Sequence, residues 1–361
     1  MRIDELEKIA KRRRLDRALV MNPANVRALT GVNCDNAVVE VTAGGMGQVG
    51  QKGQKGRVTF YTDFRYVPMV HRVAPGLKVA DIRRLGARSS GSDAGRKSGR
   101  RQGCRRIGYE SSISHARFLK LQKQFPKATF VDIAEDLSRL RAVKTADEIA
   151  ALRAAEALDC EIWETARRQF KAGMTERQMA RIIQKLMIER GEGEAFDTIV
   201  CVGKNAAECH HEPDDTVWNG REPVLVDMGV RLNGVCSDLT RNIVPKRPSP
   251  AYRRAYDLVL KANRAAIAAA KPGITGRQLD KVARDIIREG GFGKCFGHSL
   301  GHGVGYEIHE APTASKRDKT VLKPGMLVTV EPGIYLEGNL GVRIEDLVLI
   351  TETGCEILSQ N

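Results

Sequence analysis

The first third of the chain alternates short apolar runs with stretches of mixed polarity. Apolar runs at residues 18–21, 58–61 and 129–133 have the length expected of strands. Helices are expected from about residue 25 and near residues 115–125. This order of strands and helices predicts an α/β unit.

The second half of the chain contains a repeated pattern. Residues 171–179 match residues 271–279 at five of nine positions, with an offset of 100 residues. Each copy contains a threonine followed three residues later by a glutamine, Thr175/Gln178 and Thr275/Gln278, the capping box that opens many helices. Apolar residues then recur at i, i+3, i+4, i+7 and i+8. We therefore expect two amphipathic helices, which end at Gly191 and Gly290.

A third capping box helps to place a domain boundary. Thr145 and Glu148 open a stretch whose apolar residues have helical spacing. The boundary is therefore expected near residues 137–146, with domains at 1–137 and 141–361. The predicted fold class is α/β (α+β).

Two apolar runs follow the first copy of the repeat, and Asn233-Gly234 lies between them. Asn-Gly between apolar runs is the strongest short signal for a hairpin. If these two residues form the turn, Asp227 lies opposite Thr240 and diagonal to Asp238. A turn shifted by one residue places Asp227 directly opposite Asp238. In either register the two carboxylates share one face of the hairpin.

A second hairpin is expected after the second copy. Glu331 and Glu345 are placed symmetrically about Gly338, so a loop of three or five residues puts both on one face. Two related halves packed about a pseudo-two-fold axis would bring all four carboxylates together. Such carboxylates cannot all stay ionised in a core without cations. The pattern therefore predicts two divalent metal ions and a metal-dependent hydrolase.

Histidines gather near the second hairpin. Three of the seven, His298, His302 and His309, occur within twelve residues, and the first two lie in a glycine-rich stretch. Oxygen-rich ligation with one imidazole suits manganese, cobalt, iron or zinc. His210 and His211 precede the first hairpin, where a surface-loop position is an equally good interpretation for either one.

Composition narrows the class of protein further. Apolar residues make up 42% of the chain, but no run of about 18 of them occurs, so no membrane helix is expected. The charged N-terminus lacks the apolar segment of a secretory signal. The eight cysteines are scattered without a CxxC pair, which argues against a zinc ribbon and is typical of free thiols in a cytoplasmic enzyme.

The formal net charge of +15 is concentrated in one stretch. Residues 83–106 hold nine arginines and lysines against a single acid, Asp93, and they are rich in glycine and serine. We interpret this stretch as a solvated basic loop. The alternative is a contact with nucleic acid or another acidic surface. No aromatic residue lies among the arginines, so a stacking platform for single strands is not supported.

These motifs resemble those of the pita-bread metallopeptidases, which include Xaa-Pro aminopeptidase, Xaa-Pro dipeptidase (prolidase), methionine aminopeptidase and the metal-free creatinases. The matching segments occur between residues 226 and 346: 226–229, 236–241, 297–305, 308–312, 329–335 and 341–346. Residues 1–135 resemble the creatinase-type N-terminal domain, chiefly at Thr62-Asp-Phe-Arg-Tyr66. The resemblance implies a creatinase-like α/β domain followed by a pita-bread catalytic domain.

The resemblance also implies roles for individual residues. It assigns five metal ligands, of which Asp238 and Glu345 bridge the ions: Asp227, Asp238, His302, Glu331 and Glu345. It assigns catalytic or substrate-side roles to His210, His298, His309 and Glu331, the last as proton shuttle. It makes Arg343 a partner of a ligand carboxylate, with Asp227 as the expected one. All five ligand types are intact, which disfavours a metal-free relative.

The function implied by the resemblance is hydrolysis of Xaa-Pro bonds at the N-terminus of peptides, with manganese as the first choice of metal. The alternative within the class is a strict Xaa-Pro dipeptidase, which needs a cation for the proline carboxylate. Lys316 and Arg317 are the candidates for that cation. The same fold could also belong to a non-peptide amidohydrolase or to a binding-only relative. We expect small proline-containing peptides as partners, a homodimer by analogy with relatives, and neither a membrane nor a nucleic-acid partner.

Overall fold

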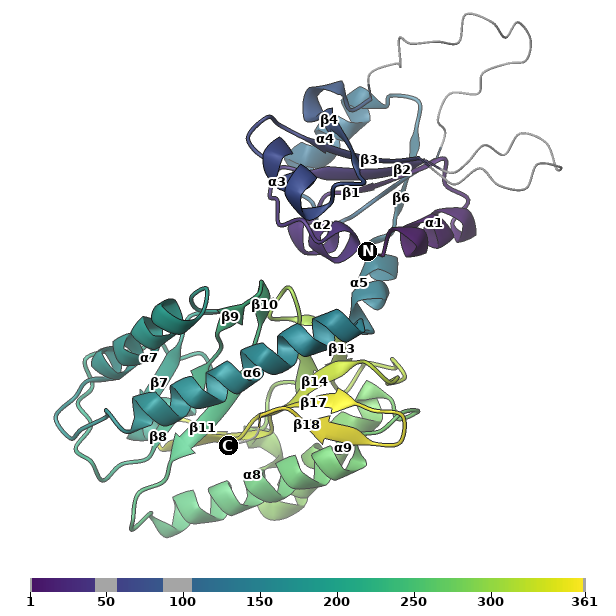
Figure 1. Cartoon of the computed structure of the whole chain (residues 1–361). Helices are drawn as coiled ribbons and strands as arrows, with labels where there is room; N and C mark the ends of the chain where they lie inside the picture. Colours follow the sequence, from purple (N-terminus) through teal and green to yellow (C-terminus); the bar gives the residue numbers. More distant parts are fainter. Residues whose placement is uncertain (1, 43–56, 87–105, 360–361) are drawn as a thin grey trace, which may run out of the picture. The chain divides into compact units, whose positions relative to one another are not determined.

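The computed structural model describes residues 2–42, 57–86 and 106–359, so most of the predicted basic loop at 83–106 lies outside the described residues. The chain divides into two compact units, Met1–Arg141 and Ala142–Asn361 (Figure 1). No helix in the described ranges combines the length and the apolar character that a membrane span requires. The seven cysteines in these ranges are all free thiols.

A six-stranded mixed sheet forms the centre of the first unit, in the order β4-β3-β2-β1-β5-β6. Its strands are β1 (Arg17–Val20), β2 (Val38–Thr42), β3 (Arg57–Thr62), β4 (Lys78–Asp81), β5 (Arg106–Tyr109) and β6 (Thr129–Asp132). β1, β2 and β3 pair antiparallel, and the other neighbours pair parallel. Its helices are α1 (Ile3–Arg12), α2 (Pro23–Thr30), α3 (Val67–Val73), α4 (His115–Gln124) and α5 (Ala134–Ala142), with a short 3-10 turn η1 (Ile82–Arg84). The α/β prediction is confirmed.

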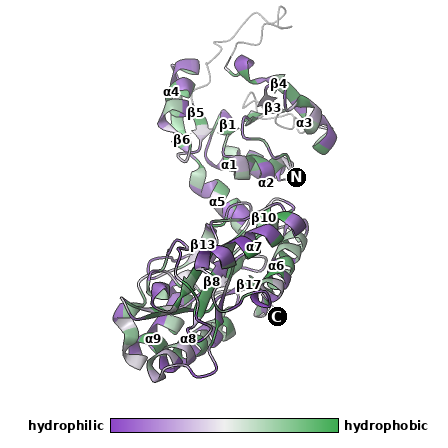
Figure 2. Cartoon of the chain, turned by 90° about the vertical axis from the view of Figure 1, so that its left-hand side faces the viewer, coloured by the Kyte–Doolittle hydropathy of each residue, from purple (hydrophilic) through white to green (hydrophobic). Residues whose placement is uncertain are grey.

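The second unit repeats one order of elements. Its first half contains α6 (Ala146–Arg167), α7 (Glu176–Arg190), β7 (Ile199–Val202), the 3-10 turn η2 (Gly203–Ala207), β8 (Val224–Met228), β9 (Arg231–Leu232), β10 (Val235–Cys236) and β11 (Leu239–Ile243). Its second half contains α8 (Pro250–Ala269), α9 (Gly276–Ile287), η3 (Arg288–Phe292), η4 (Gly293–Cys295), β12 (Gly301–Gly303), β13 (Glu310–Ala314), β14 (Leu327–Val330), β15 (Gly333–Leu336), β16 (Leu340–Arg343), β17 (Asp346–Ile350) and β18 (Cys355–Ile357). α6 packs on α7 and α8 on α9, and in Figure 2 strands such as β8 and β17 are largely hydrophobic.

All three predicted capping boxes are formed. Thr145, Thr175 and Thr275 each accept the backbone N–H three residues later, and the Glu or Gln side chain at that position accepts the backbone N–H of the threonine. Each box satisfies two backbone donors that the first helical turn leaves without partners.

The predicted end of the second repeated helix is wrong. α7 ends at Arg190, directly before Gly191, as expected. α9 ends at Ile287, and the chain continues as a π-helical turn in which Gly291, with φ of 90°, adopts the left-handed conformation. Gly290 packs against the side chain of Leu258 of α8, which would have to shift if a Cβ were added there.

The first hairpin turns at Asn233-Gly234, whose φ angles are 51° and 68°. Both are positive, as a two-residue hairpin turn of this kind requires. Val235 pairs with Leu232, and further along Thr240 pairs with Asp227. The first of the two predicted registers is therefore confirmed, and the shifted register is excluded.

The second hairpin is symmetric about Gly338, which has φ of 67°. Leu336 pairs with Leu340 across a three-residue loop, and Val330 pairs with Asp346 in the same register. The ladder is interrupted between these pairs, so that it forms two short ladders, β15–β16 and β14–β17. The first hairpin is interrupted in the same way, between β8–β11 and β9–β10.

Candidate metal centre

The four predicted carboxylates converge on one site, where Asp227 comes from the β8–β11 ladder and the other three come from the interruptions of the hairpin ladders. Asp227, Asp238 and Glu345 each place one ligand oxygen within 4.8 Å of the others. His302, on β12, lies with Nε2 3.5 Å from Oδ2 of Asp238 and 3.4 Å from Oε1 of Glu331. The structure therefore brings the five predicted ligand residues into one cluster.

Burial and mutual repulsion oppose ionisation of these acids. Burial, and next the charge of Glu345, raises the pKa of Asp238 well above its usual range. Burial, and next the charge of Glu331, does the same to the pKa of Glu345. Burial also raises the pKa of Glu331 to about 8 and lowers that of His302 to about 4. A cluster of this kind is fully ionised at neutral pH only when cations join it.

A buried acceptor without a donor shows that a cation fits here. Oδ1 of Asp227 is buried and has no hydrogen-bond partner within the described ranges, whereas Oδ2 accepts from Arg343 at 2.6 Å. Leaving a carboxylate oxygen in this state is costly unless a ligand satisfies it. Four carboxylates with one neutral imidazole form a donor set suited to divalent transition metals. The residues present therefore fit divalent metal ions in both charge and ligand type.

Arg343 connects the cluster to its surroundings. Besides Asp227, its guanidinium donates to the hydroxyl of Tyr335 at 2.8 Å and to Oγ1 of Thr240 at 3.1 Å. The hydroxyl of Thr240 in turn donates to Oε2 of Glu345 at 2.7 Å. Arg343 is buried, so these bonds hold the orientation of two carboxylates from opposite halves of the unit.

His298 is held at both ring nitrogens. Its Nδ1 lies 2.7 Å from the carbonyl oxygen of Ser299, and its Nε2 lies 3.0 Å from the hydroxyl of Tyr335. Because a carbonyl only accepts, we assign the proton to Nδ1, and Nε2 then accepts from the tyrosine. Burial, followed by the charge of Arg343, lowers the pKa of His298 to about 4, so this neutral form persists at neutral pH.

The remaining two predicted substrate-side histidines are accessible. His309 is exposed, and its ring centroid lies 4.3 Å from that of His302 in an edge-to-face arrangement. His210 is also exposed, and Cys209, directly before it, makes a side-chain hydrogen bond with Tyr335, whose hydroxyl also contacts His298. Its neighbour His211 is instead buried, which excludes a surface position for that residue.

Two buried acids behind the cluster were not predicted. Glu156 on α6 accepts the backbone N–H of Asp238 at 3.2 Å. Asp159, one turn later, accepts from Oγ of Ser237 at 2.8 Å. Both thus support the backbone that carries Asp238. The signal in the sequence was two acids on the apolar face of the helix that Thr145 opens.

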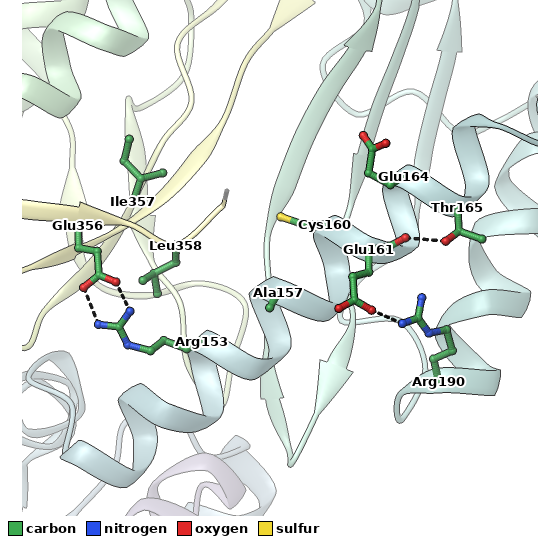
Figure 3. Close-up of a pocket in the computed structure, with 10 residues that line it drawn as sticks. All are labelled: Arg153, Ala157, Cys160, Glu161, Glu164, Thr165, Arg190, Glu356, Ile357 and Leu358. Carbon is green, nitrogen blue, oxygen red and sulfur yellow. Dashed lines mark hydrogen bonds and ion pairs between the residues drawn. The ribbon is translucent and has the colours of Figure 1, made fainter. Parts of the chain in front are cut away.

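A separate cavity of about 630 Å³ lies on another face of α6 (Figure 3). Its lining comes from α6, from the last residue of α7 and from β18 with the residue that follows it, and it includes none of the predicted site residues. Ion pairs of Arg153 with Glu356 and of Arg190 with Glu161 lie along it.

Comparisons with known proteins agree with this geometry. Residues 150–352 match the model of metallopeptidase family M24, and residues 2–143 match the creatinase/prolidase N-terminal domain. The fold and the site thus define a metallopeptidase with the pita-bread fold. The chain belongs to metallopeptidase family M24.

Individual relatives carry two different activities in their names. The Xaa-Pro dipeptidase of Pyrococcus furiosus is 41% identical over 259 residues, which are 70% of this chain and 73% of that protein. The structure of the prolidase from the same organism matches with a TM-score of 0.86 at 32% identity, covering 98% of this chain and 99% of that one. The X-Pro aminopeptidase of Thermotoga maritima matches with a TM-score of 0.82 at 30% identity, covering 98% of each chain.

Proposed function

We propose that this protein is a dinuclear metal-dependent Xaa-Pro aminopeptidase. The observation that carries the proposal is the convergence of Asp227, Asp238, His302, Glu331 and Glu345 around a buried, unsatisfied carboxylate oxygen. These five residues would hold the ions. Manganese is the proposed native metal, and cobalt, zinc or iron would suit the same ligands.

The proposed chemistry assigns one task to each polar side chain. When bound, the ions would activate a water molecule as the nucleophile and polarise the carbonyl that precedes proline. Glu331 would take up the proton of that water and deliver it to the departing proline nitrogen. Its Oε1 accepts a hydrogen bond from Oγ1 of Thr329 on β14 at 3.1 Å, which restrains the carboxylate.

The three histidines would act on the substrate side. His309 is accessible beside His302, so it would donate a hydrogen bond to the developing oxyanion. His298 is held by Tyr335 and Ser299, so it would contact substrate only after exchanging one of these bonds. His210 would bind the peptide at the rim, where its ring is exposed.

Four cations of the catalytic unit already hold acids, which bears on the choice between an aminopeptidase and a strict dipeptidase. A dipeptidase must bind the proline carboxylate with a cation, but Arg343 binds Asp227 and Arg284 binds Asp280. Arg241 and Lys144 likewise bind Asp346 and Glu310. The two candidates from the sequence, Lys316 and Arg317, are exposed. Cations that already hold acids are poorly suited to bind a free proline carboxylate, and this supports the aminopeptidase, while Lys316 and Arg317 stay the candidates for the dipeptidase.

Prolidase activity is the second candidate, because the Pyrococcus furiosus relative and its structure are named for it. The deciding experiment strips the protein of metal, restores Mn²⁺, Co²⁺ or Zn²⁺, and compares an Xaa-Pro-Yaa tripeptide with the Xaa-Pro dipeptide. The proposal expects the tripeptide to be cleaved with the higher kcat/KM, most rapidly with Mn²⁺. Cleavage of the dipeptide alone would establish the prolidase instead.

A matched pair of variants connects this activity to the cluster. Asp238→Asn removes one charge from a proposed metal ligand and is expected to lower both metal content and turnover. Asp215→Asn makes the same change at an exposed carboxylate of the same unit and is expected to alter neither.

Two further assignments belong to the proposal. We place the protein in the cytoplasm, which its free cysteines support, since a reducing compartment keeps thiols unpaired. We also expect a homodimer, by the resemblance to relatives. Light scattering of the purified chain tests the second assignment, and a mass near 39.8 kDa would reject it.

A further inference from the structure

A buried glutamate fastens both ends of the loop that carries His210. Glu176, the first residue of α7, is fully buried. Its Oε1 accepts from the backbone N–H of Val202 at 2.6 Å and from Asn205 at 2.9 Å, at the start of the loop. Its Oε2 accepts from the backbone N–H of Asp214 at 3.0 Å, at the far end. One carboxylate therefore closes the loop from residue 203 to residue 214.

His211 makes the fourth contact with this carboxylate. Its Nε2 lies 2.7 Å from Oε2 of Glu176, and its Nδ1 lies 3.2 Å from Oε2 of Glu208. With an acceptor at each ring nitrogen, both can donate only when the ring is an imidazolium. His211 is nine-tenths buried, and Asp214 is a third carboxylate facing it.

His210 directly precedes His211, so a fixed His211 restricts where His210 can lie. The two rings differ in exposure, because His210 is exposed while His211 is buried against Glu176 of α7. Cys209, on the other side of His210, hydrogen-bonds Tyr335, the residue that also contacts His298 and Arg343. The loop is also backed by the second half of the unit, because a Cβ at Gly341 of β16 would collide with Ala206 of η2. The loop is thus tied to α7 at both ends and packs against β16 at η2.

We propose that the His211–Glu176 ion pair is a latch whose task is to position His210 beside the metal centre. This makes His211 a positioning residue, and it rests on the proposed function for the role of His210. His298 and His309 have comparable supports. Arg284 binds Asp280 and donates to the carbonyl of His298, and Lys144 binds Glu310, the neighbour of His309.

The latch differs from these supports because an imidazole titrates near neutral pH. Burial opposes the charge of His211, but the bonds to Glu176 and Glu208 prevail and raise its pKa above the usual value. A raised pKa means that the contribution to stability is complete below about 6.5, the ordinary value, and is lost as pH rises through the folded-state pKa. The loop should therefore loosen on the alkaline side, while the arginine and lysine supports hold.

A metal ion is a poorer explanation of the same cluster. Glu176, His211 and Asp214 do place ligand atoms within 4.8 Å of one another. Both oxygens of Glu176, however, already accept backbone N–H groups, and Oδ1 of Asp214 accepts the N–H of Thr216 at 2.7 Å. Oε1 of Glu176 already accepts from Val202 and Asn205, and its Oε2 from Asp214 and His211, so a cation would have to replace one of these donors. An ion pair therefore accounts better for these contacts.

The test uses the full chain and two variants of His211. His211→Gln keeps a donor for Glu176 without the charge, and His211→Leu removes both. Arg153→Gln is the control, since it breaks an ion pair of the same unit at the separate cavity (Figure 3). Two quantities are measured between about pH 5.5 and 9, on either side of the ordinary histidine pKa: hydrogen-exchange protection factors of residues 203–214 in the metal-free protein, and kcat/KM on an Xaa-Pro-Yaa peptide with Mn²⁺ restored.

We expect His211→Leu to lower loop protection and to reduce kcat/KM about 10- to 100-fold, as a displacement of a substrate-side group near 1 Å would. Metal content should not change. His211→Gln should retain part of the loop protection and part of kcat/KM. Its loop protection should not decline as pH rises, whereas that of the wild type should. Unchanged protection or unchanged kcat/KM in His211→Leu would overturn the proposal. If that variant does not fold, His211→Gln with a wild-type pH profile overturns it equally.

The exchange measurement needs no substrate and no metal. If the wild type cleaves no Xaa-Pro peptide, the proposed function fails, yet the loop protection still decides whether the latch exists. If the peptide is cleaved and the variants behave like the wild type, the latch fails alone.

Discussion

Replacing Lys144 by methionine tests how much a buried ion pair contributes to the catalytic unit. Nζ of Lys144 lies 2.7 Å from Oε2 of Glu310, and the two side chains are 3% and 1% exposed. Gly305 packs directly against both, since a Cβ there would meet each of them. Methionine fills the volume of the lysine stem but leaves the Glu310 carboxylate in the core without this cation. Removing one member of a buried pair typically costs about 3–5 kcal/mol.

The assay can isolate the catalytic unit. Both tryptophans of the chain, Trp163 and Trp218, lie in that unit, so their fluorescence during urea unfolding follows it rather than the N-terminal unit. The free energy of unfolding obtained from the urea midpoint should fall by about 3–5 kcal/mol in Lys144→Met. The double variant Lys144→Met/Glu310→Leu should recover most of the loss, because no charge of this pair then remains buried. A loss below about 1 kcal/mol in the single variant would place this pair with exposed ion pairs and refute the reasoning.

Further expected outcomes concern the metal centre and one helix cap. Glu331→Ala should abolish peptide turnover while tryptophan fluorescence and circular dichroism stay as in the wild type, and near wild-type activity would contradict the assignment of Glu331. In the metal-free protein, burial raises the pKa of Glu331 to about 8, so the stability that this side chain confers should be lost as pH rises from about 4.5 to about 8. The unfolding temperature of the wild type should therefore be lower at about pH 8 than at about pH 5, and Glu331→Gln should reduce this difference. Thr275→Ala removes the acceptor of the N–H of Gln278 and should cost about 1 kcal/mol in urea unfolding, with no change in metal content.

Local signals in the sequence narrowed the register of the first hairpin to two possibilities and predicted the symmetry of the second. Asn233-Gly234 dictates a two-residue turn, and Gly338 supplies the positive φ of the three-residue loop. Once these turns are fixed, the two-residue period of a strand decides which side chains share a face. The opposition of Asp227 and Thr240 is one of the two pairings that this counting allows, and the structure selects it.

Contacts between distant segments could not be predicted in this way. Lys144 and Glu310 are 166 residues apart, and His211 and Glu176 are 35 apart. Nothing in the residues next to His211 distinguishes it from an exposed loop histidine, because its burial depends on α7 packing against the loop. The end of α9 was missed for a similar reason. Gly290 packs against Leu258 on another helix, and it is Gly291 that adopts the left-handed conformation after α9 ends at Ile287.

The four carboxylates of the metal centre come equally from the two interrupted hairpins, one in each half of the catalytic unit. Asp227 and Asp238 come from one half, and Glu331 and Glu345 come from the other. Each half on its own therefore contributes only two of the four carboxylates. The charge repulsion that requires cations arises when the two halves pack together. A polypeptide cut between Ile243 and Pro250 would yield two fragments whose reassociation depends on divalent ions. The ions would then hold the two fragments together in addition to taking part in catalysis.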